Sequence, residues 1–299
     1  MINKTLAFQS ILISLIIFSG SISNLSAQEG TKTPDGTNLK RSSYYGVQST
    51  IPSYKRVNPD FKDLELPCSA EGDEIIRHTG YTLSYNIEHK QARWVAYKLT
   101  AEETRPAVKR NNRFIPDPEV LTGSASNNDY KNSGYDKGHL APSADMCYSI
   151  VTMQESFYLS NMSPQKPGFN RGIWKELEAQ VRQWAIDDSI IFIVTGGVLA
   201  AGMPAIGSNK VSVPKLFYKV IIDFHGDVPK GIGFVIPNDK SNKRLQSYTV
   251  TIDSVEVLTG INFFCRLPDD MEKKIESVTD TTLWRWQPVS NGGGKQEED

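Results

Sequence analysis

The residues best suited to chemistry lie in a short stretch, residues 135 to 142, which reads YDKGHLAP. Asp136 precedes His139 by three positions, Gly138 permits a tight backbone turn, and Pro142 stiffens the chain beyond it. A neutral histidine held in one pose is a suitable general base near neutral pH. The same residues also fit an ordinary loop histidine beside a turn. The stretch by itself does not decide between the two interpretations.

A second group of polar residues follows in residues 158 to 182. Asn161 and Asn170 fall in predicted loops, and Asn170, Glu178 and Arg182 lie on one side of a predicted helix because they are spaced by multiples of four. A carboxamide oxygen at the helix start and a carboxylate two turns later can hold a hydrated divalent ion, for which Mg²⁺ is better suited than zinc. Alternatively, Asn170 is a plain N-cap and Glu178 pairs with Arg182 on the surface.

Basic residues cluster in residues 104 to 113, TRPAVKRNNR, which contain no acid. The segment indicates either a phosphate-facing patch or a solvated surface loop. The chain as a whole is not basic, since it has 33 Lys and Arg against 34 Asp and Glu. Such a balance argues against a protein that coats nucleic acid through its overall charge.

The elements that must position these residues are strands with helices set among them. Period-two alternation or short apolar runs predict strands, and they fall at residues 81–86, 93–99, 190–194, 215–223 and 231–236. Helical spacing predicts a helix over residues 171–185 with Asn170 as its cap, and a second over 252–259 between Thr251 and Gly260. This mixture indicates an α+β layered domain.

The ends of the chain differ in composition from the part between them. Residues 1–27 combine Lys4, a short apolar run and small residues ending at Ala27, the layout of a secretory signal peptide. We therefore expect an exported protein, periplasmic or extracellular, with no membrane span. Residues 28–63 read as an irregular lead-in, 64–288 as one domain and 289–299 as a flexible tail.

The three cysteines, Cys68, Cys147 and Cys265, allow one disulfide in an oxidising compartment, with one thiol left over. Their spacing does not choose the pair. None has the CxxC spacing of a cysteine-based zinc site.

Taken together, YDKGHLAPSAD, FYLSNMSPQ and NRGIWKELE resemble, in this order, the motifs of the DNA/RNA non-specific endonuclease family. The resemblance extends over roughly residues 65 to 285, from HTGYTLSYN to SVEVLTGINFF. It implies a ββα-metal finger, also called a His-Me finger, in an α+β fold whose central antiparallel sheet is flanked by helices. It also implies a metal-dependent hydrolase that cleaves DNA and RNA and leaves 5′-phosphate and 3′-hydroxyl ends.

The same resemblance assigns roles to the residues of the motifs. By position, His139 matches the general base and Asn161 the residue that orients its imidazole. Asn170 matches the direct ligand of one Mg²⁺, with Mn²⁺ as the alternative metal. Glu178 matches the carboxylate that holds metal-bound waters, and Asp136 the acid beside the metal shell.

Basic residues are expected to contact the substrate. Arg110 matches an arginine that stabilises the transition state, and Arg182 a helix arginine near the scissile phosphate; we also expect Arg113 and Lys137 to bind substrate. The family usually has arginine at the position of Lys137. Lysine keeps the charge but loses the planar fork, which weakens the expected phosphate contact rather than the chemistry.

Two other functions remain open on the sequence. One is a module that binds nucleic acid on a nuclease scaffold without turnover, which the near-neutral charge and Lys137 would favour. The other is a phosphomonoesterase or cyclic-phosphodiester hydrolase with similar groups; a serine mechanism lacks the G-x-S-x-G elbow. The sequence leaves open the preference between DNA and RNA and whether the protein forms a homodimer.

Overall fold

The computed structural model describes residues 62–68, 74–224 and 228–288, which belong to one compact unit, Pro52–Asp299. The predicted signal peptide, nearly all of the lead-in and the predicted tail lie outside the described residues. None of the helices in the described part of the chain has the length and apolar character needed to cross a bilayer.

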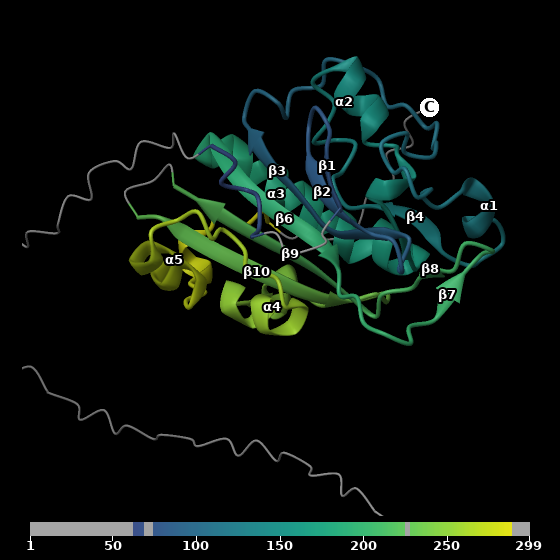
Figure 1. Ribbon diagram of the computed structural model, residues 1–299. Coiled ribbons are helices and arrows are strands. Elements are labelled where there is room, and N and C mark those ends of the chain that lie inside the picture. Colours follow the sequence, from purple (N-terminus) through teal and green to yellow (C-terminus); the bar gives the residue numbers. More distant parts are fainter. Residues whose placement is uncertain (1–61, 69–73, 225–227, 289–299) are drawn as a thin grey trace, which may run out of the picture. The chain divides into compact units, whose positions relative to one another are not determined.

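A seven-stranded antiparallel sheet forms the centre of the unit (Figure 1). In spatial order its strands are β1 (Glu74–Arg77), β2 (Thr82–Asn86), β3 (Gln91–Thr100), β6 (Ile190–Gly197), β9 (Leu216–Asp223), β10 (Lys230–Pro237) and β11 (Thr249–Val250). The five strands predicted from the sequence correspond to β2, β3, β6, β9 and β10. Two small antiparallel pairs stand apart, namely β4 (Asp136–His139) with β5 (Met162–Gln165) and β7 (Ala205–Ile206) with β8 (Val211–Ser212).

Both faces of the sheet are covered, because alternate side chains of a strand point to opposite faces. In β3, Val95, Tyr97 and Leu99 join one core, whereas Trp94 and Ala96 join another. Helix α3 (Lys175–Asp188) packs into the first core, and α4 (Ile252–Thr259) and α5 (Asp269–Glu276) pack into the second. Figure 1 shows α3 on one side of the sheet and α4 and α5 on the other. The expectation of an α+β fold with a central antiparallel sheet flanked by helices is therefore confirmed.

The shorter helical segments lie in the connections between these elements. They are α1 (Asn127–Tyr130), α2 (Ile150–Glu155), the 3₁₀ turns η1 (Leu159–Asn161), η3 (Leu245–Tyr248) and η4 (Thr281–Leu283), and the π turn η2 (Phe169–Trp174). A disulfide joins Cys68 to Cys265 with 5.9 Å between their Cα atoms, and Cys147 is a buried free thiol.

The ends of helix α4 were predicted correctly, whereas the start of helix α3 was not. Helix α4 begins and ends as predicted, with the Thr251 hydroxyl accepting a hydrogen bond from the Ser254 N–H and Gly260 in the left-handed conformation, at φ 66°. The other helix does not begin at an Asn170 cap. Asn170 lies inside the π turn η2, where Gly172 has non-helical angles, and α3 begins at Lys175. The prediction of an Asn170 cap was wrong, and π turns of this kind are frequent at functional sites.

Candidate active site

The hairpin of β4 and β5 carries His139 and leads through η2 into α3. The two strands pair from Asp136 opposite Gln165 to His139 opposite Met162. Gly138 is required by this close approach, because a Cβ there would lie 2.1 Å from Cδ of the Gln165 side chain. His139 is the last residue of β4, and its pairing with Met162 of β5 fixes its position.

Two aromatic rings and one guanidinium surround the His139 imidazole. Its ring centroid lies 4.8 Å from that of Phe157, edge to face, and 5.7 Å from that of Phe114. Nε2 is buried and has no hydrogen-bond partner among the described residues. Burial, together with the positive charge of Arg110, lowers the pKa of His139 to about 3. The imidazole is therefore neutral across the physiological range, and its Nε2 has no hydrogen bond to the described part of the chain.

Asn161 acts on the backbone next to His139 and not on the ring. Its Oδ1 accepts a hydrogen bond from the Ala141 N–H at 2.9 Å, and its Nδ2 donates to the carbonyl oxygens of Ala141 and Ser156. Its own carbonyl accepts from the Leu140 N–H at 3.0 Å. These contacts correct the expectation that the Asn161 side chain orients the imidazole directly. It holds residues 140 and 141, and so positions His139 through the main chain.

Asp136 fixes the orientation of the Asn170 carboxamide. One oxygen of Asp136, Oδ2, accepts from Asn170 Nδ2 at 2.9 Å and from Arg171 Nε at 2.9 Å, while Oδ1 accepts from the Arg171 guanidinium at 2.7 Å. With its NH₂ group engaged, Asn170 presents Oδ1, which has no donor among the described residues. A carbonyl-type oxygen held by a neighbouring carboxylate fits a hard divalent cation.

Glu178 interacts electrostatically with a buried lysine, Lys219. Lys219, on β9, is fully buried, has no hydrogen-bond partner for Nζ among the described residues, and places Nζ 5.1 Å from the Trp174 ring centroid. Burial raises the pKa of Glu178 and lowers that of Lys219, and the attraction between the two charges opposes both shifts. Lys219 therefore favours the ionised form of Glu178.

The two arginines are each held by a polar partner. Arg182 donates to Asp145 Oδ1 at 2.8 Å, and Asp145, fully buried, also accepts from the Tyr97 hydroxyl. Arg182 therefore pairs with Asp145 and not with Glu178, which excludes the surface-pair alternative for the helix. Arg110 donates from Nε to Asn112 Oδ1 and from Nη1 to Ser143 Oγ. Its guanidinium carbon lies 5.1 Å from the centroid of the Phe157 ring.

His139, Asn170, Glu178 and the two arginines, Arg110 and Arg182, line one cavity of about 420 Å³. Five of its lining residues are cationic and one is acidic, although the whole chain is close to neutral. The full lining is Arg110, Lys137, His139, Pro142, Ser143, Ala144, Asn170, Arg171, Lys175, Glu178 and Arg182. A strongly positive, partly enclosed surface of this kind favours a polyanion.

A neighbouring cavity of about 580 Å³ shares Arg110, Lys137, Asn170 and Arg171 with the first. Phe114, Tyr130 and Tyr135 line it as well, and Lys137 Nζ lies 4.5 Å from the Phe114 ring centroid. The two cavities therefore form adjoining parts of one groove, with apolar rings beside the cations.

Most of the residues predicted from the sequence meet in this groove, and a few do not. Asp136 lines the second cavity, and Asn161 is buried behind His139. From the basic segment 104–113 only Arg110 reaches either cavity, whereas Arg113 is exposed and lines neither.

Sequence reasoning missed Arg171, Lys175, Asp145 and Lys219. Lys219 had a usable signal, because it is the one charge between Leu216 and Ile222 in an otherwise apolar or aromatic strand. Such a charge needs a partner or a reason to be buried.

Comparison with known proteins agrees with this geometry. A family model described as DNA/RNA non-specific endonuclease matches residues 65–270. A nuclease from Nostoc sp. is 34% identical over 255 residues, which cover 78% of this chain and 92% of that protein. Nuclease C1 from Cunninghamella echinulata is 34% identical over 241 residues, covering 74% of this chain and 92% of its own length. The crystal structure of the EndoG/EndoGI complex contains a chain that matches with a TM-score of 0.64 and 33% identity, covering 69% of this chain and 90% of that one.

Proposed function

Because the chain belongs to the DNA/RNA non-specific endonuclease family, we propose that His139 is its general base and that one Mg²⁺, held through Asn170, supports hydrolysis to 5′-phosphate and 3′-hydroxyl ends. The enzyme is a phosphodiester hydrolase acting on nucleic acid. The observation that supports the proposed roles best concerns Nε2 of His139, which has no hydrogen-bond partner among the described residues. His139 lines the same cavity as Asn170, whose amide is oriented by Asp136.

In the proposed reaction, neutral His139 accepts a proton from the attacking water. The rings of Phe114 and Phe157 pack against the imidazole and restrict its orientation. Burial, and to a lesser extent the charge of Arg110, hold the pKa of His139 low in the free enzyme. A bound phosphodiester adds negative charge nearby, which raises the pKa again and makes the imidazole a stronger base when substrate is present.

The metal would be held by Oδ1 of Asn170, with Glu178 as the nearby carboxylate for its water shell. When bound, a divalent cation relieves charge on the phosphate and stabilises the leaving alkoxide. Asp136 holds the Asn170 amide in this orientation. Burial raises the pKa of Glu178, and the positive charge of Lys219 opposes that rise and so favours the ionised form. Mg²⁺ prefers such oxygen donors and retains water, and Mn²⁺ is the alternative.

Arg110 and Arg182 are proposed to bind the scissile phosphate. Arg110 is braced by Ser143 and Asn112 and Arg182 by Asp145, so both guanidinium groups are placed before substrate arrives. Lys137, Arg171 and Lys175 add positive charge along the groove. Contacts of this kind read phosphate and carry no base information, in keeping with cleavage that ignores sequence and sugar.

We also propose that the protein acts after export, in the periplasm or outside the cell. The disulfide between Cys68 and Cys265 supports this proposal, because such bonds persist in oxidising compartments. Fractionation of expressing cells, with and without residues 1–27, tests it. Retention of the full-length chain in the cytoplasm would contradict export.

The activity is tested by incubating the purified chain with plasmid DNA and with RNA, with Mg²⁺, with Mn²⁺ and with EDTA. We expect both substrates to be cut with metal and neither with EDTA. The cut ends should require phosphate removal before a kinase can label them. Retarded DNA that stays intact would indicate a binding module instead, and cleavage in EDTA would contradict the metal's role.

A further inference from the structure

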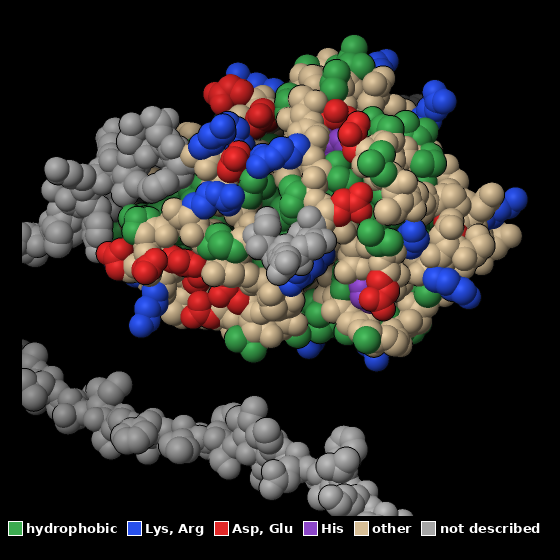
Figure 2. Space-filling view, viewed as in Figure 1, with side chains coloured by type: hydrophobic (Ala, Val, Ile, Leu, Met, Phe, Trp, Pro, Cys, Tyr) green, Lys and Arg blue, Asp and Glu red, His purple; other side chains and the backbone are tan. Residues whose placement is uncertain are grey.

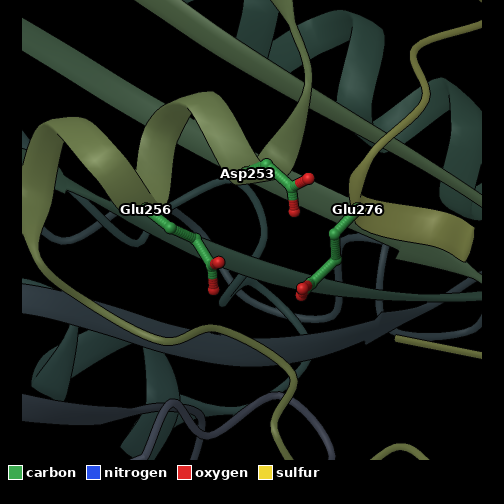
Figure 3. Close-up of side chains that lie close together, drawn as sticks. All are labelled: Asp253, Glu256 and Glu276. Atoms are coloured by element: carbon green, nitrogen blue, oxygen red, sulfur yellow. The ribbon is translucent and has the colours of Figure 1, made fainter. Parts of the chain in front are cut away.

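A second group of carboxylates lies between α4 and α5. Asp253 and Glu256 project from α4 and Glu276 from the last residue of α5, and Figure 3 shows the three side chains reaching into the space between the two helices. One carboxylate oxygen from each residue lies within 4.8 Å of the others. Figure 2 shows that acidic side chains also gather on the surface over α5.

Glu276 distinguishes this cluster from an ordinary acidic surface. Its side chain is only 3% exposed, and its buried Oε1 has no hydrogen-bond partner among the described residues. Within the described part of the chain none of the three acids forms an ion pair. Glu256 has one partner, because its Oε1 accepts a hydrogen bond from the Phe263 N–H at 2.7 Å.

The position of Glu276 adds to the electrostatic cost. It is the last residue of α5, where the exposed carbonyl groups carry partial negative charge, so the helix offers the carboxylate no stabilisation. A buried carboxylate without a partner is expensive and requires a proton or a cation. Without a cation, burial and the charges of Glu256, Glu272 and Asp253 raise the pKa of Glu276 to about 9.

We propose that Asp253, Glu256 and Glu276 bind one Ca²⁺. Oxygens bound to the same Ca²⁺ at about 2.4 Å lie no more than about 4.8 Å apart. One oxygen of each of the three carboxylates lies within 4.8 Å of the others, so the three can share one ion. Mg²⁺ holds its ligands at about 2.1 Å in a stricter octahedron and gives up water reluctantly. A site with three carboxylate ligands from two helices therefore suits Mg²⁺ less well than Ca²⁺. Three carboxylates satisfy part of the six to eight oxygens that Ca²⁺ takes, and water supplies the rest.

The site would join α4 to α5 on the face of the sheet opposite α3. Val255 of α4 and Ile275 of α5 belong to the same core as Phe263, whereas the catalytic groove is built from elements on the other side. Ca²⁺ bound there would stabilise the C-terminal part of the domain without taking part in phosphodiester hydrolysis.

The test uses the full chain with Asn170→Ala, so that a metal in the groove does not contribute. After treatment with EDTA and dialysis at pH 7.5, radioactive Ca²⁺ is measured by equilibrium dialysis. We expect one bound equivalent. Adding Glu276→Gln should abolish this uptake, whereas adding Asp270→Asn, which changes an exposed acid of the same helix, should leave it intact.

Thermal unfolding provides a second measurement. Ca²⁺ at about 100 times its Kd should raise the Tm of the Asn170→Ala protein by roughly 5 to 10 °C. If the Glu276→Gln protein fails to fold, Asp253→Asn with Glu256→Gln replaces it, since Asp253 is exposed and Glu256 half-buried. The absence of uptake by the Asn170→Ala protein, or uptake that survives loss of the carboxylates, would overturn the proposal and leave Glu276 as a protonated acid.

Discussion

At the scale of single residues, Asp136 is expected to control metal binding indirectly, through the orientation of the Asn170 side chain. Its carboxylate engages the NH₂ group of Asn170 and both ends of the Arg171 fork. Asp136→Ala releases the Asn170 amide to rotate, so we expect the metal concentration for half-maximal activity to rise about 10- to 100-fold.

Titration of cleavage rate against Mg²⁺ measures this effect. Excess metal should restore much of the rate to the Asp136→Ala enzyme but not to an Asn170→Ala enzyme, which lacks the ligand oxygen. Glu88→Ala, at an exposed acid remote from the groove lining, serves as the control. An unchanged metal requirement in Asp136→Ala would show that the amide needs no such support.

Lys219 should set the pH range in which the enzyme works. Because it lowers the pKa of Glu178 against the effect of burial, Lys219→Met should raise that pKa and keep Glu178 protonated to higher pH. The acid limb of the kcat/KM profile should move upward by about one pH unit or more. Lys215→Met, at an exposed lysine just before β9, should leave the profile in place. A Lys219→Met profile that superimposes on the wild type contradicts this role.

At the scale of elements, the β4–β5 hairpin depends on the lack of a side chain at Gly138. A Cβ there meets Cδ, Oε1 and Cγ of Gln165 at 2.1 to 2.4 Å. Gly138→Ala should therefore destabilise the fold by about 1 to 3 kcal/mol and displace His139, with a loss of activity. Urea unfolding and cleavage assays measure the two effects.

The double variant Gly138→Ala with Gln165→Ala separates steric conflict from other causes. Removing the Gln165 side chain takes away the atoms that the new Cβ would meet, so part of the lost stability should return. A double variant whose losses simply add would rule out this contact as the source.

The long strands of the sheet could be predicted from the sequence, whereas β4, β5 and the start of α3 could not. Apolar runs and period-two alternation predicted the long strands of the sheet because most of their residues are buried, on both faces in β3. It did not predict β4 and β5, whose residues DKGH and MSPQ have no strand-like pattern and are ordered by their pairing with each other. The start of α3 was misplaced because the π turn η2 is imposed by its surroundings and not by local propensity.

The site was predictable to the extent that its residues are close in the chain or share a motif. His139, Asn170 and Glu178 meet in the groove as their motifs indicated. Lys219 interacts with Glu178 because β9 and α3 contribute to the same core. The two residues are far apart in the sequence, so no local pattern predicts their interaction. The Asn161 side chain forms its hydrogen bonds with the backbone of Ala141 and not with the His139 ring. This choice of partner likewise depends on the three-dimensional arrangement.

At the scale of the whole molecule, the Cys68–Cys265 disulfide links the start of the described domain to the segment before α5. It closes a sequence separation of 197 residues. By loop entropy alone such a bond contributes on the order of 5 kcal/mol, an upper estimate. Replacing both cysteines by serine should lower the Tm clearly, and reductant should no longer change it.

Cys147→Ser provides the matched control, since Cys147 is the free thiol. Reductant should lower the Tm of that variant as much as it lowers the wild type. Equal Tm values for the wild type with and without reductant would show that the disulfide carries little of the stability.

The distribution of charge also belongs to this scale. The chain has a formal net charge of −1, yet six cationic residues line the two cavities of the catalytic groove, and acids gather at α4 and α5 on the other face of the sheet. Separation of charge allows the enzyme to attract a polyanion to one place without binding it everywhere.

The most direct test of the account is the single-turnover rate of plasmid cleavage by His139→Ala at saturating Mg²⁺. If His139 is the general base, the rate should fall by about 10²- to 10⁴-fold while the Tm stays close to that of the wild type. A rate within a few-fold of the wild type, in a variant that is folded and binds DNA, would contradict the account.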